Sequence, residues 1–258
     1  MLILIAESKT MGLCDIPVSP EDYIKHMPAL ASEADGIMDA LRESDADELA
    51  TRMKLSLQMV RKLQQMVYEF PNKLLGSPAI EAFTGVVFKA FSYATLGSKA
   101  RNQAIDDVRI ISSLYGWLRP DDIVKPYRFD FTTPLAPGGL RFAVYWKNGA
   151  VTRCLLEELR QGRHHDILNL LPGDAARCID WSKIPSDVRV WKADFREVQP
   201  GGALKTPNSG RLKTLRGLLL RQIVMDGITA PHELMSLEGD YYVGSGSADT
   251  DGNIVYYI

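Results

Sequence analysis

The segment at 115–128 carries the side chains best suited to binding phosphate and bases. It reads Tyr-Gly-Trp-Leu-Arg-Pro at 115–120 and Lys-Pro-Tyr-Arg at 125–128, so two prolines and a glycine stiffen a loop that bears three cations. An arginine fork suits phosphate oxygens, and aromatic rings can stack on exposed bases. The alternative is a structural loop whose rings fill the core and whose arginine pairs with Asp121 or Asp122. The expected phosphate contacts are Arg119, Lys125 and Arg128, and the expected stacking groups are Tyr115 and Tyr127.

A second group of cations lies on an amphipathic helix predicted over 211–224. Lys213 and Arg216 are three residues apart and are therefore neighbours on one face of this helix. The preceding Asn-Ser-Gly offers a cap and free N–H groups, which suit an anion, and Gly217 allows a bulky partner close to the backbone. A solvated helix face is the alternative. The other phosphate contacts expected here are Arg211 and Arg221.

Lys9 follows a predicted buried strand at 2–6, whose sequence is Leu-Ile-Leu-Ile-Ala. Ligands of α/β sheets bind at the carboxyl ends of strands. We therefore expect Lys9 to join the phosphate-binding cations.

Other polar clusters give no metal or cofactor prediction. His164 and His165 are adjacent, so their rings diverge, and a solvated turn is expected; the aspartates at 249–253 suit a hairpin turn better than a calcium loop. No Gly-rich nucleotide motif is present. We expect inert thiols at Cys14, Cys154 and Cys178, which lack metal-ligand spacing.

The remaining patterns predict one mixed α+β domain over 1–258, with a mixed sheet, surrounding helices and a C-terminal β-hairpin. Further strands are predicted at 79–83, 108–112, 166–171 and 188–195. Helices are predicted from Ser19, from Ser44 to Phe70, over 98–107 and over 142–162.

Charge is unevenly distributed along the chain. Residues 20–50 hold nine acids against two bases, whereas residues 199–225 hold five bases and no acid, within a formal net charge of −2. One basic face is therefore possible despite the neutral total. No apolar run is long enough to span a bilayer and no secretory signal is evident, so a cytoplasmic protein is expected.

The order of several motifs resembles the bacterial YaaA family, which is linked to peroxide stress. The resemblance covers nearly the whole chain and rests on the text at 1–5, 9–10, 82–85, 114–120, 126–128, 145–146, 169–170, 213, 216–217 and the tyrosine-rich tail. It implies a compact "cantaloupe" fold, a basic cleft and a helix–hairpin–helix-like element that binds duplex or branched DNA. It also implies a role in limiting iron-dependent damage, with no cofactor. We place the hairpin at 112–120, with Ser113 and Gly116 bringing N–H groups near phosphate.

Three positions depart from the family pattern. Ser113 stands where glycine is usual, and Val86 stands where the family carries an acid. Leu171 to Asp174 replaces a segment that usually carries Ala-Ser and a nearby Glu-Tyr. If those polar positions serve an active site, this chain has an altered one.

Two functions are therefore expected. The first is a non-enzymatic protein that holds DNA in a basic cleft, without sequence preference. The second is an enzyme that acts on a small phosphorylated or nucleotide substrate in the same cationic region. The first needs a wide cleft with dispersed cations, and the second a closed pocket of roughly 300–1,000 Å³ with convergent polar groups. An iron-handling or protein-interaction module has little support.

Overall fold

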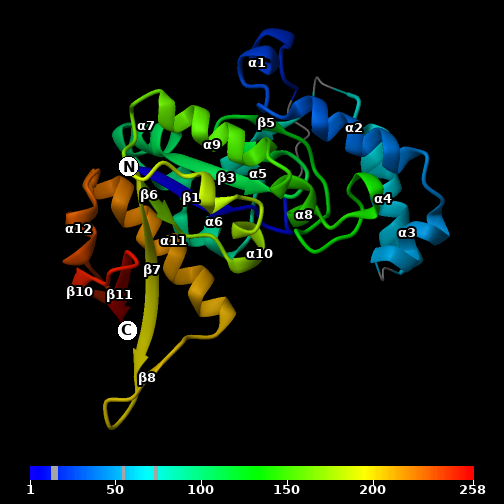
Figure 1. Ribbon diagram of the computed structural model, residues 1–258. Helices are drawn as coiled ribbons and strands as arrows, with labels where there is room; N and C mark the ends of the chain where they lie inside the picture. The colour runs from blue at the N-terminus through cyan, green and yellow to red at the C-terminus, as the bar shows by residue number, and fades with distance from the viewer. Residues whose placement is uncertain (13–16, 54–55, 73–74) are drawn as a thin grey trace.

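The computed structural model describes residues 1–12, 17–53, 56–72 and 75–258, and Figure 1 shows a twisted sheet with helices on both sides. The main sheet contains nine strands of the described chain. Their order is β4 (Gly116–Leu118), β3 (Val108–Ser112), β1 (Leu2–Ala6), β6 (Asp166–Asn169), β7 (Arg189–Val198), β11 (Asn253–Tyr257), β10 (Tyr242–Ala248) and β9 (Glu238–Gly239), with β8 (Leu204–Lys205) paired to β7. A separate small sheet pairs β2 (Ser77–Pro78) with β5 (Ile123–Val124).

The centre of the main sheet is parallel. β3, β1, β6, β7 and β11 run in one direction, and antiparallel strands flank them at both edges. All five residues of β1 and all five of β3 are buried, as expected for parallel strands covered on both faces. The carboxyl ends of these strands therefore emerge at one edge.

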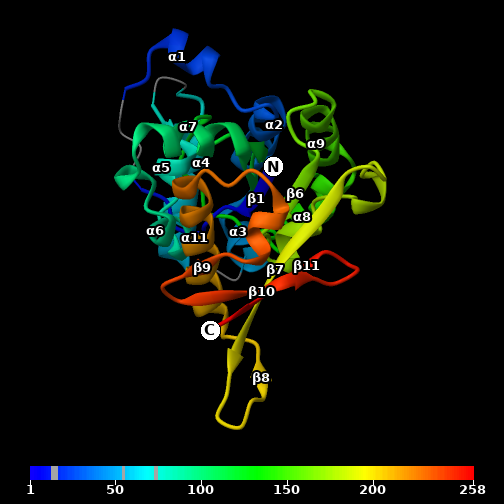
Figure 2. The same ribbon diagram turned by 90° about the vertical axis from the view of Figure 1, so that its left-hand side faces the viewer.

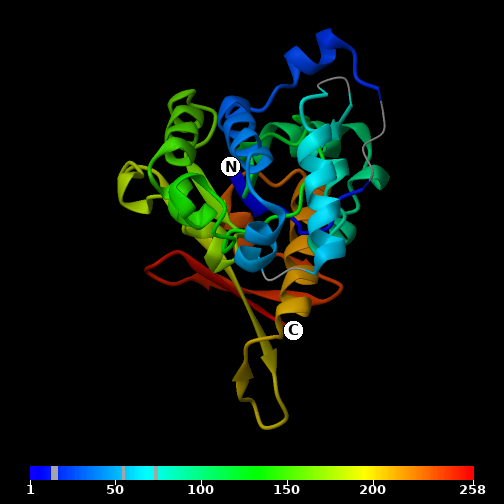
Figure 3. The same ribbon diagram turned by 90° about the vertical axis from the view of Figure 1, so that its right-hand side faces the viewer.

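Helices cover both faces of this sheet. Their bounds are α1 (Pro20–Lys25), α2 (Ala31–Arg42), α3 (Ala46–Met53), α4 (Leu57–Glu69), α5 (Ala79–Ala82), α6 (Val86–Phe91), α7 (Ser98–Asp107), α8 (Phe142–Lys147), α9 (Ala150–Arg160), α10 (Gly173–Ala176), α11 (Ser209–Asp226) and α12 (Pro231–Met235). Short 3-10 turns lie at Tyr93–Thr95, Pro137–Gly139 and Trp181–Lys183. Figures 2 and 3 show α6, α7 and α11 on one side of the sheet and α8 and α9 on the other. No described helix has the length and apolar character needed to cross a membrane.

Many predicted elements are confirmed. The strands at 2–6 and 108–112, the helix at 98–107 and the C-terminal hairpin are all present. Ser19 caps α1 by accepting the Asp22 N–H at 3.0 Å.

Three predictions differ from the structure. Residues 79–83 were expected as a strand, but Ala79–Ala82 form a helical turn. The helix predicted over 142–162 is two helices, because Gly149 at φ +123° interrupts it. The helix predicted from Ser44 to Phe70 also divides, and Ser56 caps its second part, α4.

The second half of β7 leaves the body of the protein. With β8 it forms a two-stranded arm that projects from the sheet in Figures 1 and 2. The chain then returns from this arm into α11.

Candidate functional site

The carboxyl ends of β1 and β6 bring two polar segments together. β1 pairs in parallel with β6, so residues 7–10 and 170–174 leave the sheet at the same edge. This is the edge at which open parallel sheets bind ligands. Residues 130–131 and the start of α6 close the space between these segments.

A cavity of about 310 Å³ lies at this edge. Its apolar wall includes Ile5, Phe88 and Leu170, which are nearly fully buried. Its polar lining consists mainly of charged side chains: Glu7, Lys9, Asp130, Asp174, Lys213 and Arg216. The cavity therefore combines an apolar interior with three cations and three carboxyl groups.

Close packing of α6 against α11 places the two helix cations at this cavity. Gly217 has no side chain, and a Cβ there would lie 2.3 Å from the backbone oxygen of Val87. The sequence predicted that Gly217 lets a bulky partner approach the backbone, and in the structure that partner is α6 of the same chain. This contact fixes Lys213 and Arg216, which precede it on α11, beside the cavity.

Lys213 and Arg216 are available to a ligand. Neither side chain forms a hydrogen bond or an ion pair with another residue in the described part of the chain. Arg216 is half-buried, and this burial lowers its pKa while the nearby Asp174 opposes the shift. A half-buried guanidinium without a partner is costly unless an anion meets it.

Lys9 is held at the mouth of the cavity. Its Nζ lies 2.7 Å from Oδ2 of Asp130, and its side chain is 70% exposed. Burial alone would raise the pKa of Asp130, but hydrogen bonds from Lys9 and Thr132 lower it to about 2. Asp130 therefore stays ionised at neutral pH and tethers Lys9.

Glu7 lies deeper in the same cavity. Its Oε2 accepts a hydrogen bond from the Ser113 N–H at 2.9 Å and another from the Tyr127 hydroxyl. Burial raises the pKa of Glu7 to about 7, although hydrogen bonds from Ser113 and Tyr127 oppose the shift. A carboxyl group that titrates near neutral pH can act as an acid or a base.

The arrangement suits a phosphate-bearing molecule with a less polar body. Arginine and lysine side chains supply charge and hydrogen bonds to phosphate oxygens, and the interior buries the remainder. Among the described residues, no group of three or more histidine, cysteine, aspartate or glutamate side chains is placed to hold a metal ion.

The other expected phosphate contacts do not meet at this cavity. Arg119 pairs with Asp121 at 3.3 Å, and Arg211 pairs with Glu197 at 2.7 Å. Arg221 donates to the Phe91 and Ser92 carbonyls at the end of α6, so it joins two helices. Lys125 is buried, with its Nζ donating to the Phe70 carbonyl. The expectation that all eight cations form one surface is therefore wrong.

Arg128, the fifth expected contact outside the cavity lining, differs from these four because it has no partner among the described residues. It is exposed and makes no ion pair or hydrogen bond with another described residue. Burial alternates from 127 to 131, which places Arg128 on the same side of the segment as Asp130.

Tyr115 and Tyr127 are buried and offer no face to a base. Both residues are 4% exposed, and their rings pack against each other with centroids 5.8 Å apart. Tyr127 also stacks on Phe129. The stacking role expected for these tyrosines is replaced by core packing and, for Tyr127, by its hydrogen bond to Glu7.

The segment at 112–120 is a β-hairpin. Strands β3 and β4 pair through Ser112 and Gly116, and Ser113 is fully buried. Gly116 has φ +66°, and a Cβ there would lie 2.8 Å from Leu30. Because the turn is buried, its N–H groups cannot meet DNA phosphates, and the placement of a helix–hairpin–helix-like element here is wrong.

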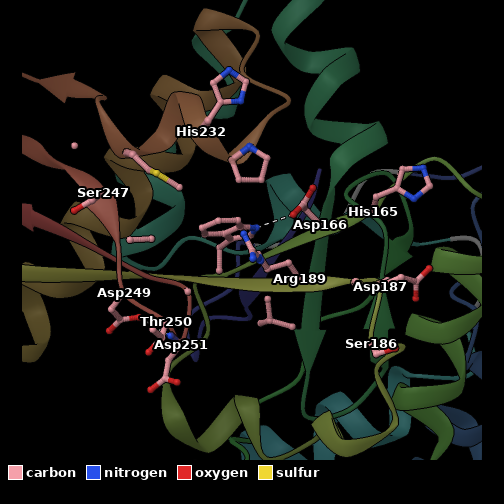
Figure 4. Close-up of a pocket in the computed structure, with 18 residues that line it drawn as sticks. His165, Asp166, Ser186, Asp187, Arg189, His232, Ser247, Asp249, Thr250 and Asp251 are labelled. Atoms are coloured by element: carbon pink, nitrogen blue, oxygen red, sulfur yellow. Dashed lines mark hydrogen bonds between the residues drawn. The ribbon is translucent and has the colours of Figure 1, made fainter.

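A larger hollow of about 1,220 Å³ lies at the opposite, amino-terminal edge of β6 and β7. Figure 4 shows its polar side chains coming from several segments and pointing apart. Asp166 accepts a hydrogen bond from Trp191 Nε1 at 2.7 Å, and Arg189 lies over the Trp191 ring. Four aspartates line this hollow, against one arginine, so it disfavours a phosphate.

The minor predictions have mixed outcomes. His164 is buried rather than solvated, and this burial lowers its pKa to about 4; His165 is exposed. The aspartates at 249–253 do form a hairpin turn. Cys154 is partly buried and Cys178 is buried, and burial raises the pKa of both thiols, while Cys14 lies outside the described residues.

The sequence prediction omitted three carboxyl groups of the site, Glu7, Asp130 and Asp174. The sequence contained a signal for Glu7, because this residue directly follows the predicted buried strand at 2–6. The same position after the strand led to the prediction for Lys9. Asp130 carried no comparable signal, and Asp174 was noted only as part of the segment 171–174 that departs from the family pattern. Tertiary packing brings both to this edge.

Comparison with known proteins agrees with the resemblance. Residues 1–246 match the family described as "Peroxide stress protein YaaA". A UPF0246 protein of Rhizorhabdus wittichii is 30% identical over 251 residues, covering 97% of this chain and 96% of the relative. Relatives with the same description from Burkholderia orbicola and Bordetella avium are 28% and 29% identical, and each alignment covers 99% of this chain and 98% of the relative.

Proposed function

Because this chain belongs to the YaaA family of peroxide stress proteins, we propose that it serves this response by binding a small phosphorylated molecule in the cavity at the carboxyl edge of β1 and β6. The phosphate would lie between Lys213 and Arg216, with Lys9 at the mouth. The apolar wall would hold the rest of the molecule.

The observation that carries this proposal is the convergence on one cavity of Lys213 and Arg216, whose side chains form no ion pair or hydrogen bond among the described residues. Asp174 lies near Arg216 but forms no ion pair with it, and the volume of about 310 Å³ lies at the lower end of the range for small-molecule sites. A duplex could touch the mouth of such a cavity but could not be enclosed by it.

Binding of inorganic phosphate and of nucleoside 5′-monophosphates tests the proposal. Isothermal titration calorimetry should detect both, and Lys213→Ala and Arg216→Ala should each weaken binding about 10- to 100-fold, the value of a lost charge-assisted hydrogen bond. Lys205→Ala is the matched control, because Lys205 is exposed on β8 and does not line the cavity. Unchanged binding in both cavity variants refutes the proposal.

DNA binding is a second proposal, supported by one observation. Arg128 is exposed and unpaired in the segment that also supplies Asp130 to the cavity, so it could extend the phosphate-binding surface beyond the mouth. A DNA backbone or strand end would then present phosphates to Arg128, Lys9 and Lys213. Any role in limiting iron-dependent damage would follow from this second proposal.

Gel-shift titrations with single-stranded, duplex and junction DNA separate the two proposals. If DNA is the partner, its affinity falls steeply with salt through counterion release, and Lys213→Glu with Arg216→Glu abolishes binding. If affinity is absent at low salt, or does not change with salt, the DNA proposal fails. Nucleotide binding by the same preparation would leave the first proposal standing.

A further inference from the structure

The cavity at the carboxyl edge of β1 and β6 has carboxyl groups as well as cations in its lining. Among the described residues, three cations and three acids line it: Lys9, Lys213, Arg216, Glu7, Asp130 and Asp174. Each phosphate of a ligand brings at least one negative charge, which cations attract and carboxylates repel. The number of phosphates that the cavity can accept therefore depends on which cations remain free of an acid.

Asp130 is a fixed negative charge at the mouth of the cavity. Its Oδ1 accepts hydrogen bonds from the Thr132 N–H at 2.8 Å and from the Thr132 hydroxyl at 2.6 Å, while its Oδ2 lies 2.7 Å from the Nζ of Lys9. Burial alone would raise the pKa of Asp130, but hydrogen bonds from Lys9 and Thr132 lower it to about 2. The carboxylate is therefore charged at neutral pH, is held in one orientation, and cancels the charge of Lys9.

Asp174 places a second negative charge beside Arg216. It is half-buried in the cavity lining, and its Oδ1 accepts a hydrogen bond from the Ala175 N–H at 2.9 Å. Burial lowers the pKa of Arg216, and Asp174 opposes this shift, so the two charges interact although they form no ion pair. Asp174 therefore reduces the attraction of this end of the cavity for any charge beyond the first phosphate.

The free cations match one phosphate monoester. Once Lys9 is set against Asp130, Lys213 and Arg216 are the cations that remain in the described lining. A phosphate monoester carries roughly −1.5 to −2 charges near pH 7, so a single group uses both cations. A second phosphate would lie either against the apolar wall, where it would lose its hydration, or near Asp130 at the mouth, where it would be repelled.

We infer that the cavity selects molecules with a single phosphate monoester, and that Asp130 and Asp174 are the specificity-determining residues that exclude di- and triphosphates. This inference rests on the proposed function, because Lys213 and Arg216 must first hold the phosphate. Arg128 does not line the cavity, and it lies on the same side of its segment as Asp130. A phosphate chain that extended toward Arg128 would therefore pass the charge of Asp130.

Calorimetry with adenosine 5′-mono-, di- and triphosphate tests the selection. The titrations use the full chain without divalent cations, at about pH 7.5, where a terminal phosphate carries close to two charges. The affinity of the wild-type protein should fall roughly three- to tenfold with each added phosphate, the effect of one further charge several ångströms from a carboxylate. A triphosphate that binds as tightly as the monophosphate overturns the inference.

Asp130→Asn and Asp174→Asn test the two carboxylates. Each change removes a negative charge and nearly preserves the shape of the side chain. The ratio of diphosphate to monophosphate affinity should rise roughly three- to tenfold in each variant, and Asp130→Asn should also tighten both ligands because it frees Lys9. Asp187→Asn is the matched control, since Asp187 is exposed at the opposite edge of the sheet, and it should leave the ratio unchanged.

The outcomes separate this inference from the proposed function. An unchanged ratio in both variants overturns the selection by charge, and a rise in one variant alone overturns the role of the other carboxylate. If the monophosphate still binds and Arg216→Ala weakens it, the proposed function survives either result. If none of the three nucleotides binds the wild-type protein, both are overturned. The wild-type series decides the selection even where one variant fails to fold.

Discussion

Gly217→Ala tests the helix contact on which the site depends. The new Cβ would lie 2.3 Å from the Val87 carbonyl oxygen and 2.7 Å from the Ala90 Cβ. Atoms at these distances overlap, and backbone on α6 cannot rotate away as a side chain could. The two helices must therefore separate by about 1 Å.

The expected cost follows from two opposing effects. Overpacking a tight contact costs about 1–3 kcal/mol, while replacing glycine in a helix interior returns up to about 1 kcal/mol. The net loss lies between about 0 and 3 kcal/mol, and its middle range of about 1–2 kcal/mol lowers the melting temperature by about 2–8 °C in a protein of this size. Phosphate affinity should fall as well, because Arg216 is adjacent to the altered position.

Gly36→Ala is the matched control. Gly36 lies inside α2, and a Cβ there meets nothing within 4 Å. This change should stabilise the protein by roughly 0.5–1 kcal/mol. Differential scanning calorimetry of both variants decides the matter: if Gly217→Ala melts at or above the wild-type temperature, the packing argument is wrong.

Two further predictions concern buried charges. Glu7 has a folded pKa of about 7 against an ordinary value of 4.5, so its contribution to stability is complete below pH 4.5 and is lost as pH rises through 7. The loss amounts to about 3 kcal/mol by pH 8.5. In urea titrations, the free energy of unfolding of Glu7→Gln should therefore rise relative to that of the wild type as the pH increases. Glu43→Gln, at an exposed position, is the control and should show no such trend. Glu158→Gln breaks the buried bidentate pair with Arg109, in which the distances are 2.6 and 3.0 Å, and should cost about 3–5 kcal/mol in the same assay. A loss below 1 kcal/mol would show that the pair is solvated.

Elements with strong local signals were predictable from the sequence. The five apolar residues of β1 and the capped start of α1 follow from composition and spacing, and the structure contains both. Lys9, Lys213 and Arg216 were among the eight cations expected to bind phosphate, and these three share one cavity.

Other features depended on tertiary contacts that no local pattern encodes. Arg119 and Lys125 have the composition of phosphate-binding residues, but an adjacent aspartate and a distant carbonyl satisfy them. The sequence is compatible with Tyr127 on the surface or in the core. In the structure its ring is in the core, where its hydroxyl donates a hydrogen bond to Glu7. Cation patterns along a sequence therefore predict charge but not orientation.

The position of β1 in the sheet has a consequence for how the site assembles. Its register partners are Val108 on β3 and Ile167 on β6, both more than a hundred residues away along the chain. Such distant pairings carry a large loop-closure entropy and raise contact order, which slows folding. Glu7 and Lys9 extend from this strand, so a partly folded intermediate that lacks the central pairing would have neither of these two side chains at the cavity. Ligand protection against hydrogen exchange should accordingly extend over the whole parallel centre of the sheet rather than over the loops alone.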